Sequence, residues 1–173
     1  MIYYTYMKTT PWEVVSSKLS DSYLAGFLDG DGSIVATVAK QDPKRYPNKP
    51  LRIILRINFT QHKRYEGILV AIKEYFGDVG SVRYSATHNL SELVIVKRED
   101  VEAVICRLLP HLILKQRQAS IALEMISIFK NCKRVSKNAI APQDFVKLMR
   151  MTIQIRKLNS RTGGKKDLTL STP

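Results

Sequence analysis

One ten-residue segment alternates so regularly that it restricts the fold more than any other part of the chain. From Leu51 to Thr60, every second side chain is apolar, and most of those in between are polar. The apolar set is Ile53, Leu55, Ile57 and Phe59, and the other set is Arg52, Ile54, Arg56 and Asn58. A period of two is typical of a β-strand with one face in a core. The segment therefore predicts a sheet that helices cover on one face only.

The segments around this strand switch between helical and strand periodicity. Ser20 and Asp21 can cap a helix entered at Ser22, and the run Asp29-Gly30-Asp31-Gly32 should stop it. Further strands are expected over 33–41, 81–86 and 92–97, and further helices over 63–76, 99–109, 117–130 and 142–158. The order α-β-β-α-β-β-α predicts an α+β fold with a mixed or antiparallel four-stranded sheet backed by helices.

The length of 173 residues, of which 45% are hydrophobic, suits one domain with its own core. We expect an N-terminal extension over 1–18, a folded domain over 19–159 and a basic tail over 160–173. No run approaches the roughly 18 apolar residues of a membrane helix, so no membrane partner is expected. Cys106 and Cys132 cannot form a disulfide framework or a four-ligand zinc site, and we expect both to be buried.

The net charge of +13 is concentrated in the last third of the chain. Residues 1–110 carry 15 basic and 12 acidic side chains, whereas residues 111–173 carry 13 and 3. A basic excess of this kind indicates a polyanionic partner such as nucleic acid.

The most specific motif is the nine-residue segment LAGFLDGDG, Leu24 to Gly32. It resembles the signature of the LAGLIDADG homing endonucleases and matches it at six positions. The resemblance continues through Thr60-Gln61 and through the run from Leu114 to Gln118. It is strongest to the single-motif enzymes encoded in group I introns of algal organelles. It implies the homing-endonuclease fold with an antiparallel sheet, a homodimer, and double-strand cleavage of a long near-palindromic DNA target that promotes intron homing.

The chemistry of phosphodiester hydrolysis is consistent with the residues of this motif. Mg²⁺ prefers oxygen ligands, and Asp31 and the Gly30 carbonyl lie at a helix end where both can face a cation. Mn²⁺ is expected to substitute, and Ca²⁺ to support binding without cleavage. For Asp29, hydrogen bonding to local backbone is favoured over a metal-ligand role.

The resemblance also assigns supporting catalytic roles. Gln61 occupies the position that helps place the attacking water, and Lys115 that of a basic residue near the scissile phosphate. The sequence departs from the family where a basic residue is expected and Tyr65 stands instead; Lys63 and Arg64 both remain candidates for that role. Ser85 stands where a relative has arginine, so the target sequence should differ.

The motif helix should also form the dimer. Gly26 and Gly30 lie four residues apart and, with Ala25, leave a stripe on which two helix backbones can approach closely. Leu24 and Phe27 complete the predicted dimer interface. Close helices would bring two Asp31 side chains together across a minor groove about 6 Å wide.

The open face of the sheet should read DNA in the major groove. Its predicted DNA-binding residues are Val35, Thr37, Gln41, Arg52, Arg56, Asn58, Arg83, Ser85 and Glu92. In the tail, Arg161, Lys165 and Lys166 suit phosphate contacts.

Two other functions remain open. A splicing maturase of the same fold would bind intron RNA, and a catalytically silent protein would bind DNA only. The first twenty residues hold neither an apolar core nor an arginine, so no signal or transit peptide is expected. The resemblance implies an organelle, the chloroplast before the mitochondrion.

Overall fold

Four antiparallel strands form the centre of the computed structural model, which describes residues 18–46, 51–132, 134–136 and 139–159. The predicted tail, with Arg161, Lys165 and Lys166, lies outside the described residues, as does nearly all of the predicted N-terminal extension. The elements are α2 (Asp21–Asp31), β1 (Gly32–Lys40), β2 (Leu51–His62), η1 (Lys63–Tyr65), α3 (Glu66–Tyr75), β3 (Ser81–Ser85), β4 (Leu90–Ile95), α4 (Arg98–Leu108), η2 (Leu109–His111), α5 (Gln116–Asn131), β5 (Arg134–Ser136), β6 (Ala139–Ile140) and α6 (Pro142–Leu158).

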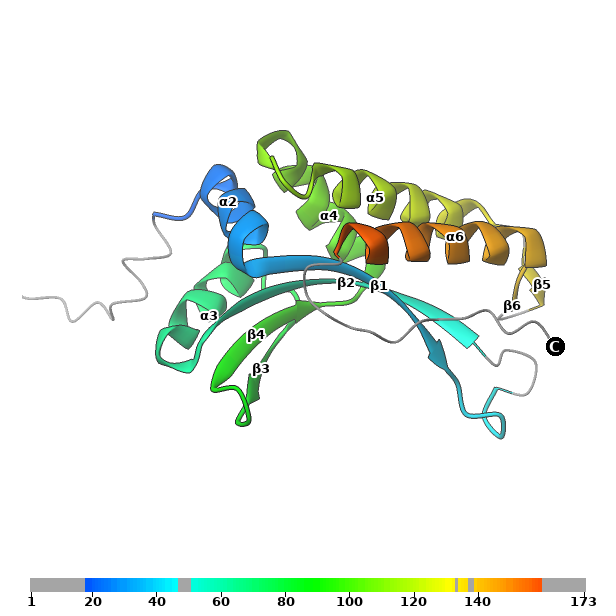
Figure 1. Ribbon diagram of the computed structural model, residues 1–173, viewed down its shortest axis with the longest axis horizontal. Helices are drawn as coiled ribbons and strands as arrows, with labels where there is room; N and C mark the ends of the chain where they lie inside the picture. Colours follow the sequence, from blue (N-terminus) through cyan, green and yellow to red (C-terminus); the bar gives the residue numbers. More distant parts are fainter. Residues whose placement is uncertain (1–17, 47–50, 133, 137–138, 160–173) are drawn as a thin grey trace, which may run out of the picture.

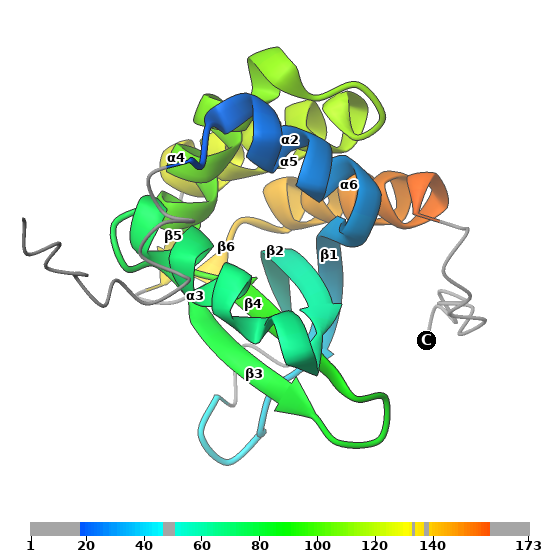
Figure 2. The ribbon, with the colours of Figure 1, turned by 90° about the vertical axis from the view of Figure 1, so that its left-hand side faces the viewer.

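The strands lie in the order β1-β2-β4-β3, and every neighbouring pair is antiparallel. The predicted α-β-β-α-β-β-α order and the four-stranded sheet are therefore confirmed. The sheet arches, and α2, α4, α5 and α6 lie on its upper side, so the lower, concave face stays open (Figure 1). Figure 2 shows α2 above the ends of β1 and β2, with α4 and α5 behind it.

The core lies between the sheet and the helices. On β2 the alternate residues Ile53, Leu55, Ile57 and Phe59 are buried, as the period of two predicts. The helices add Leu28, Leu69, Ile105, Met125 and Ile155, which are all fully buried. Each large apolar side chain buried in this way contributes about 1.5–3 kcal/mol, so this one layer of contacts supports the arched sheet.

Helix α2 begins and ends where the sequence predicts. The Ser20 hydroxyl accepts a hydrogen bond from the Tyr23 N–H at 3.2 Å and caps the helix. Asp21 instead accepts hydrogen bonds from the Arg107 guanidinium and the Tyr75 hydroxyl. The Asp-Gly run stops the helix as expected, because α2 ends at Asp31 and Gly32 is its C-cap residue. Gly30 therefore lies in the last turn of the helix.

Other boundaries differ where a turn competes with a strand. Strand β4 begins at Leu90 rather than residue 92, because Asn89 adopts a left-handed φ of 49° and turns the chain there. A short 3-10 turn precedes α3, so the expected helix start at Lys63 was early. The two short strands β5 and β6 were not predicted. Cys106 is exposed, contrary to expectation, because it falls on the solvent side of α4.

Within the described residues, no helix combines the length and apolar character that a membrane span needs.

Candidate active site and DNA-binding face

The end of α2 delivers Asp31 directly to the edge of the sheet. Asp31 is the last residue of the helix and is exposed, and Gly32 starts β1 opposite Phe59 of β2. A Cβ on Gly32 would lie 2.6 Å from the Leu28 Cδ1 atom and 2.9 Å from the Asn58 carbonyl oxygen, so only glycine fits this helix-to-strand junction. The antiparallel register then places Asp31 beside the last residues of β2.

Gln61 lies in that last part of β2. Its side-chain oxygen accepts a hydrogen bond from the His62 N–H at 2.9 Å, and the residue opposite it is Ser91. Gln61 follows Phe59, the partner of Gly32, by two residues along β2.

Lys115 approaches the same place from the loop before α5. It is half-buried at the N-cap position of α5, and its ammonium donates a hydrogen bond to the Asp29 carbonyl oxygen. Burial lowers the pKa of Lys115, and the charges of Asp29 and Asp31 act in the opposite direction. Lys115 is therefore not a solvated surface lysine: it lies within electrostatic reach of Asp31.

The carboxylate of Asp29 holds the loop that carries Lys115. One of its oxygens accepts the backbone N–H groups of Ile113 at 2.7 Å and Leu114 at 3.0 Å, and the other accepts that of Lys115 at 2.9 Å. The favoured role of hydrogen bonding to backbone thus agrees with the structure, but the backbone is about a half-chain away rather than local. No spacing in the sequence could reveal this contact.

Lys63 and Arg64, the two candidates for the basic residue that the family has at the position of Tyr65, lie in different surroundings. The Lys63 ammonium lies 2.6 Å from a Glu66 oxygen, and Ser91 donates to the same oxygen. The hydrogen bond from Lys63 is the largest cause of a lowered pKa of Glu66. Arg64 instead lies over the Tyr65 ring, 4.6 Å from its centroid. The Lys63 ammonium is therefore paired with Glu66 at the start of α3, whereas the Arg64 guanidinium lies against Tyr65.

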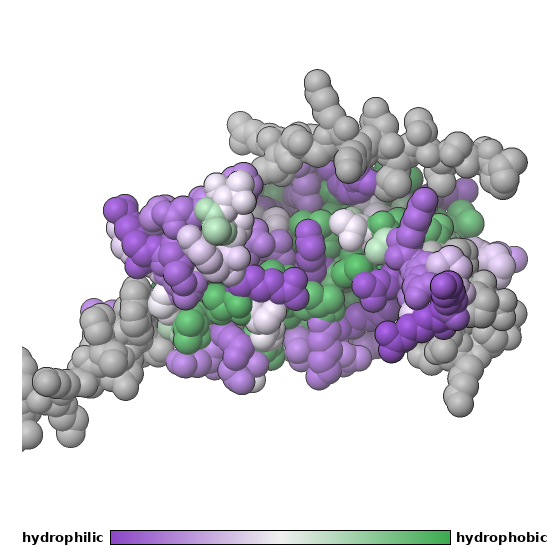
Figure 3. Space-filling view, turned by 90° about the horizontal axis from the view of Figure 1, so that it is seen from below, coloured by the Kyte–Doolittle hydropathy of each residue, from purple (hydrophilic) through white to green (hydrophobic). Residues whose placement is uncertain are grey.

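The open face collects the predicted DNA-binding residues in one surface. In the strand register Val35 lies opposite Arg56, Thr37 opposite Ile54, and Arg83 opposite Glu92. Arg52, Asn58 and Ser85 lie on the same face by alternation. Seen from below, hydrophilic side chains surround apolar ones on this surface (Figure 3), a mixture that can meet both base edges and thymine methyl groups.

Two polar atoms near the centre of this face have no hydrogen-bond partner among the described residues. They are the Arg56 Nε and the Asn58 Oδ1 atoms. Asn58 is only 8% exposed. An unsatisfied buried polar group costs about 1–3 kcal/mol, so both atoms favour a hydrogen bond with water or with a bound ligand.

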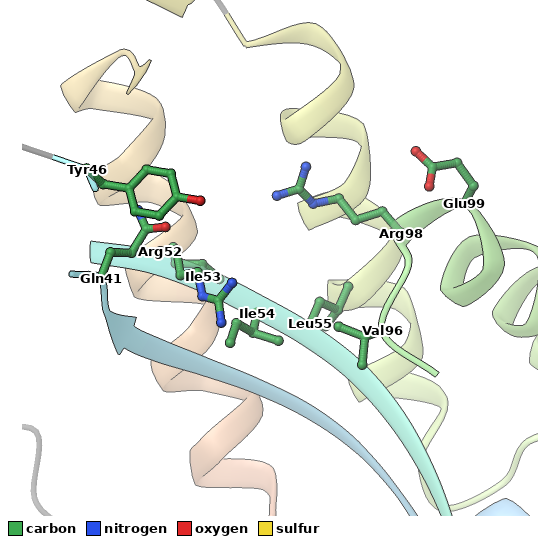
Figure 4. A pocket seen from close by; sticks show the side chains of 9 residues that line it. All are labelled: Gln41, Tyr46, Arg52, Ile53, Ile54, Leu55, Val96, Arg98 and Glu99. Atoms are coloured by element: carbon green, nitrogen blue, oxygen red, sulfur yellow. The ribbon is translucent and has the colours of Figure 1, made fainter. Parts of the chain in front are cut away.

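Gln41 lies just beyond the end of β1, at one side of a pocket. Figure 4 shows Gln41, Tyr46 and Arg52 gathered there, with Arg98 and Glu99 across the pocket. Both predicted DNA-binding residues of this group, Gln41 and Arg52, thus lie at the end of the sheet far from α2.

The exposed side of α2 is made of small and aromatic residues. Gly26 and Gly30 are exposed, and a Cβ on either would meet nothing within 4 Å. Tyr23, which is 49% exposed, lies on the same side with its ring tilted against that of Phe27, 6.3 Å between centroids. The expectation that Leu24 and Ala25 belong to this surface was wrong: both are fully buried, because the helical period turns them toward the core of their own chain.

Two exposed apolar residues next to this helix were missed. Ile113 is 84% and Leu114 72% exposed, in the loop that Asp29 holds against α2. Adjacent large apolar side chains at such exposure are typical of an interaction surface. The sequence signal exists, since both lie in the run LILKQ, but the family motif includes only Leu114, and Ile113 was not singled out.

An exposed carboxylate at a helix end, a nearby lysine and arginines on an open sheet are features that a protein cleaving nucleic acid needs. The family profile described as LAGLIDADG endonuclease matches residues 24–116. The chain therefore belongs to this family, and it is a homing endonuclease that cleaves DNA.

Individual relatives agree with this assignment. The chain is 28% identical over 137 residues to the DNA endonuclease I-CreI of Chlamydomonas reinhardtii, covering 79% of this chain and 77% of the relative. It is 29% identical over 156 residues to the DNA endonuclease I-CvuI of Chlorella vulgaris, covering 89% and 86%. The crystal structure of I-CvuI with its target and Ca has a TM-score of 0.71 at 26% identity, covering 87% of this chain and 85% of that one. A second I-CvuI structure holds the I-CreI target with Mg and uncleaved DNA.

Proposed function

We propose that this homing endonuclease acts as a homodimer that uses a divalent cation to cut both strands of a long, near-palindromic DNA site, and that cleavage promotes intron homing. The observation that carries the proposal is a single exposed Asp31 at the end of a helix whose outer surface is bare at Gly26 and Gly30. One motif per chain supplies one such carboxylate. Cutting two strands then calls for two chains, with the two α2 helices in contact.

The dimer surface extends beyond α2. The exposed Ile113 and Leu114 adjoin the helix, because Asp29 holds their backbone N–H groups. Covering them against a second chain would remove apolar area from water and stabilise the pair. The same contact would bring the two Lys115 side chains near the shared axis.

The residues present fit Mg²⁺, with Mn²⁺ as a substitute. Asp31 offers an exposed carboxylate, and Gly30 lies in the last turn of α2, where carbonyl oxygens lack a following helical donor. Both are the hard oxygen ligands that Mg²⁺ prefers. When bound, the cation would polarise the phosphate and make water more nucleophilic. Ca²⁺ is expected to support binding without cleavage.

The other residues of the site would act on charge and on water. Lys115, held near Asp31, would stabilise negative charge that develops on the scissile phosphate. Gln61 has an amide N–H₂ group in addition to the oxygen that accepts from His62. That group would orient the attacking water.

The open face would read the bases. Arg56 and Arg83 suit guanine, Asn58 suits adenine and Glu92 suits cytosine. The Arg56 Nε and Asn58 Oδ1 atoms, which have no hydrogen-bond partner in the part of the chain that the structure describes, support base contacts at the centre of this face. Arg161, Lys165 and Lys166 would add phosphate contacts, which contribute affinity without sequence information.

Replacing Arg56 with alanine should relax the preference for one base pair in each half-site. The loss of a bidentate contact should cost about 1–3 kcal/mol against the preferred base only. Competition binding with single-position target variants measures this. Arg150→Ala, which removes the same charge from the exposed side of α6, is the matched control and should leave base preference unchanged. A uniform loss over all variants in Arg56→Ala would assign Arg56 to phosphate contacts.

Selection of cleavable duplexes from a randomised DNA library tests the proposed function directly. A near-palindromic consensus, cut in both strands with Mg²⁺ and bound without cutting in Ca²⁺, is the expected result. Tight binding of structured intron RNA without cleavage of any duplex would replace the proposal with a maturase. Duplex binding with no cleavage under any divalent cation would indicate a silent DNA-binding protein.

We also propose that the protein works in an organelle, the chloroplast before the mitochondrion. Relatives from Chlamydomonas reinhardtii and Chlorella vulgaris support this assignment. Fractionation of the source organism followed by immunodetection would test it.

A further inference from the structure

The contact between Asp29 and the loop before α5 has a geometry that mere packing does not require. Three consecutive backbone N–H groups, those of Ile113, Leu114 and Lys115, donate to the two Asp29 oxygens at 2.7–3.0 Å. In return, the Lys115 ammonium donates to the Asp29 carbonyl oxygen. The two segments are therefore joined in both directions, once through a carboxylate and once through a lysine.

The loop depends on this carboxylate. Lys115 is the N-cap residue of α5 and has no side-chain capping hydrogen bond. The N–H groups just before and at the start of a helix need acceptors, and a carboxylate is the strongest one available there. Asp29 supplies it from another helix, so removing it would release the segment 113–115 from α2.

The same contact leaves Asp29 with little capacity for a cation. A carboxylate has about four lone-pair sites, and three of them are taken by the backbone N–H groups. Asp31, two residues later, is exposed instead. The two carboxylates of the motif thus differ in environment although they are two positions apart.

We propose that Asp29 is a positioning residue: it holds Lys115 against the end of α2, beside Asp31, and does not ligate the metal. The inference rests on the proposed role of Lys115 in cleavage. Through Asp29, the end of α2 would set the distance between Asp31, which would face the cation, and Lys115, which would face the phosphate.

A double-mutant cycle on the full-length protein tests this inference with the duplex selected from the randomised library. Asp29→Asn keeps the shape of the side chain, but its N–H₂ group cannot accept hydrogen bonds from the loop. Single-turnover cleavage should fall by roughly 10–100-fold, the usual cost of losing a residue that orients a site. In the Lys115→Met background the same substitution should cost less than about two-fold, since the effects of residues acting through one another do not add.

Two further readouts separate positioning from metal binding and from general instability. The Mg²⁺ concentration for half-maximal cleavage should be unchanged in Asp29→Asn, and amide hydrogen exchange should rise at residues 113–115. Asp21→Asn is the matched control, because Asp21 is also a hydrogen-bonded aspartate of α2 but contacts Tyr75 and Arg107. The folded Asp21→Asn protein should cleave DNA at the rate of the unmodified protein. If Asp29→Asn does not fold, Asp29→Glu displaces the carboxylate and serves in its place.

The outcomes are distinct. Equal fold-losses from Asp29→Asn with and without Lys115 would overturn positioning, and a raised Mg²⁺ requirement would make Asp29 a metal ligand. Unchanged hydrogen exchange at residues 113–115 would also overturn it. Failure of the unmodified protein to cut any duplex, or full activity of Lys115→Met, would instead defeat the proposed function and remove the basis for the inference.

Discussion

Asp31→Asn should lose cleavage by several orders of magnitude while retaining DNA binding. The substitution keeps the shape of the side chain but removes the negative charge that would hold Mg²⁺, and a dimer loses two such charges at once. The sheet face is untouched, so affinity in Ca²⁺ should persist. Less repulsion between this site and the DNA phosphates should tighten binding slightly. Parallel measurements on one duplex give the cleavage rate in Mg²⁺ and the binding affinity in Ca²⁺.

Chelation provides the matching test on the unmodified protein. EDTA should stop cleavage as completely as Asp31→Asn does, and added Mg²⁺ should restore it. Asp144→Asn, in the first turn of α6, removes the same charge at a distance and should leave cleavage unchanged. Normal cutting by Asp31→Asn would refute the assigned site.

Gly26→Glu should convert the protein into a folded monomer that no longer cuts both strands. A side chain at Gly26 meets nothing within 4 Å in its own chain, and glycine is the poorer helix former, so the fold should tolerate the change. In the dimer, two glutamates would face each other where the helices should touch. Sedimentation equilibrium should return about 19.7 kDa instead of twice that mass.

Two controls show that the effect belongs to the dimer surface. Ala103→Glu places the same charge on the exposed side of α4 and should leave the dimer intact. Unlike Gly26→Glu, Gly32→Ala should lower thermal stability. Its Cβ would meet Leu28 and the Asn58 carbonyl oxygen inside the chain. A Gly26→Glu protein that sediments as a dimer would exclude α2 from the interface.

Periodicity predicted those features of the fold that neighbouring residues decide. The alternation in β2 identified which residues are buried, and the same alternation identified the open face, because a strand has only two sides. Ser20 was recognised as the cap of α2 from its type and place alone. The end of α2 at Asp31, directly before Gly32, also follows from residue type, because glycine and aspartate usually interrupt helices.

The candidate site divides in the same way. Asp31, Gln61 and Lys115 could be found in the sequence because each belongs to a short motif. Their convergence could not be derived from spacing, since Asp29 contacts backbone N–H groups 84–86 residues further along the chain. The inward orientation of Leu24 and Ala25 also depended on which side of α2 meets the sheet.

The order of helices and strands, the faces of the sheet and the identity of the chemical groups can thus be predicted from the sequence, because they depend on residues within a few positions of each other. Which carboxylate of the motif is exposed and which is hydrogen-bonded, and which side of α2 is available to a partner, depend on the folded chain. A side chain's hydrogen bonds and burial are set by its neighbours in space, and for Asp29 those neighbours come from a loop between two other helices.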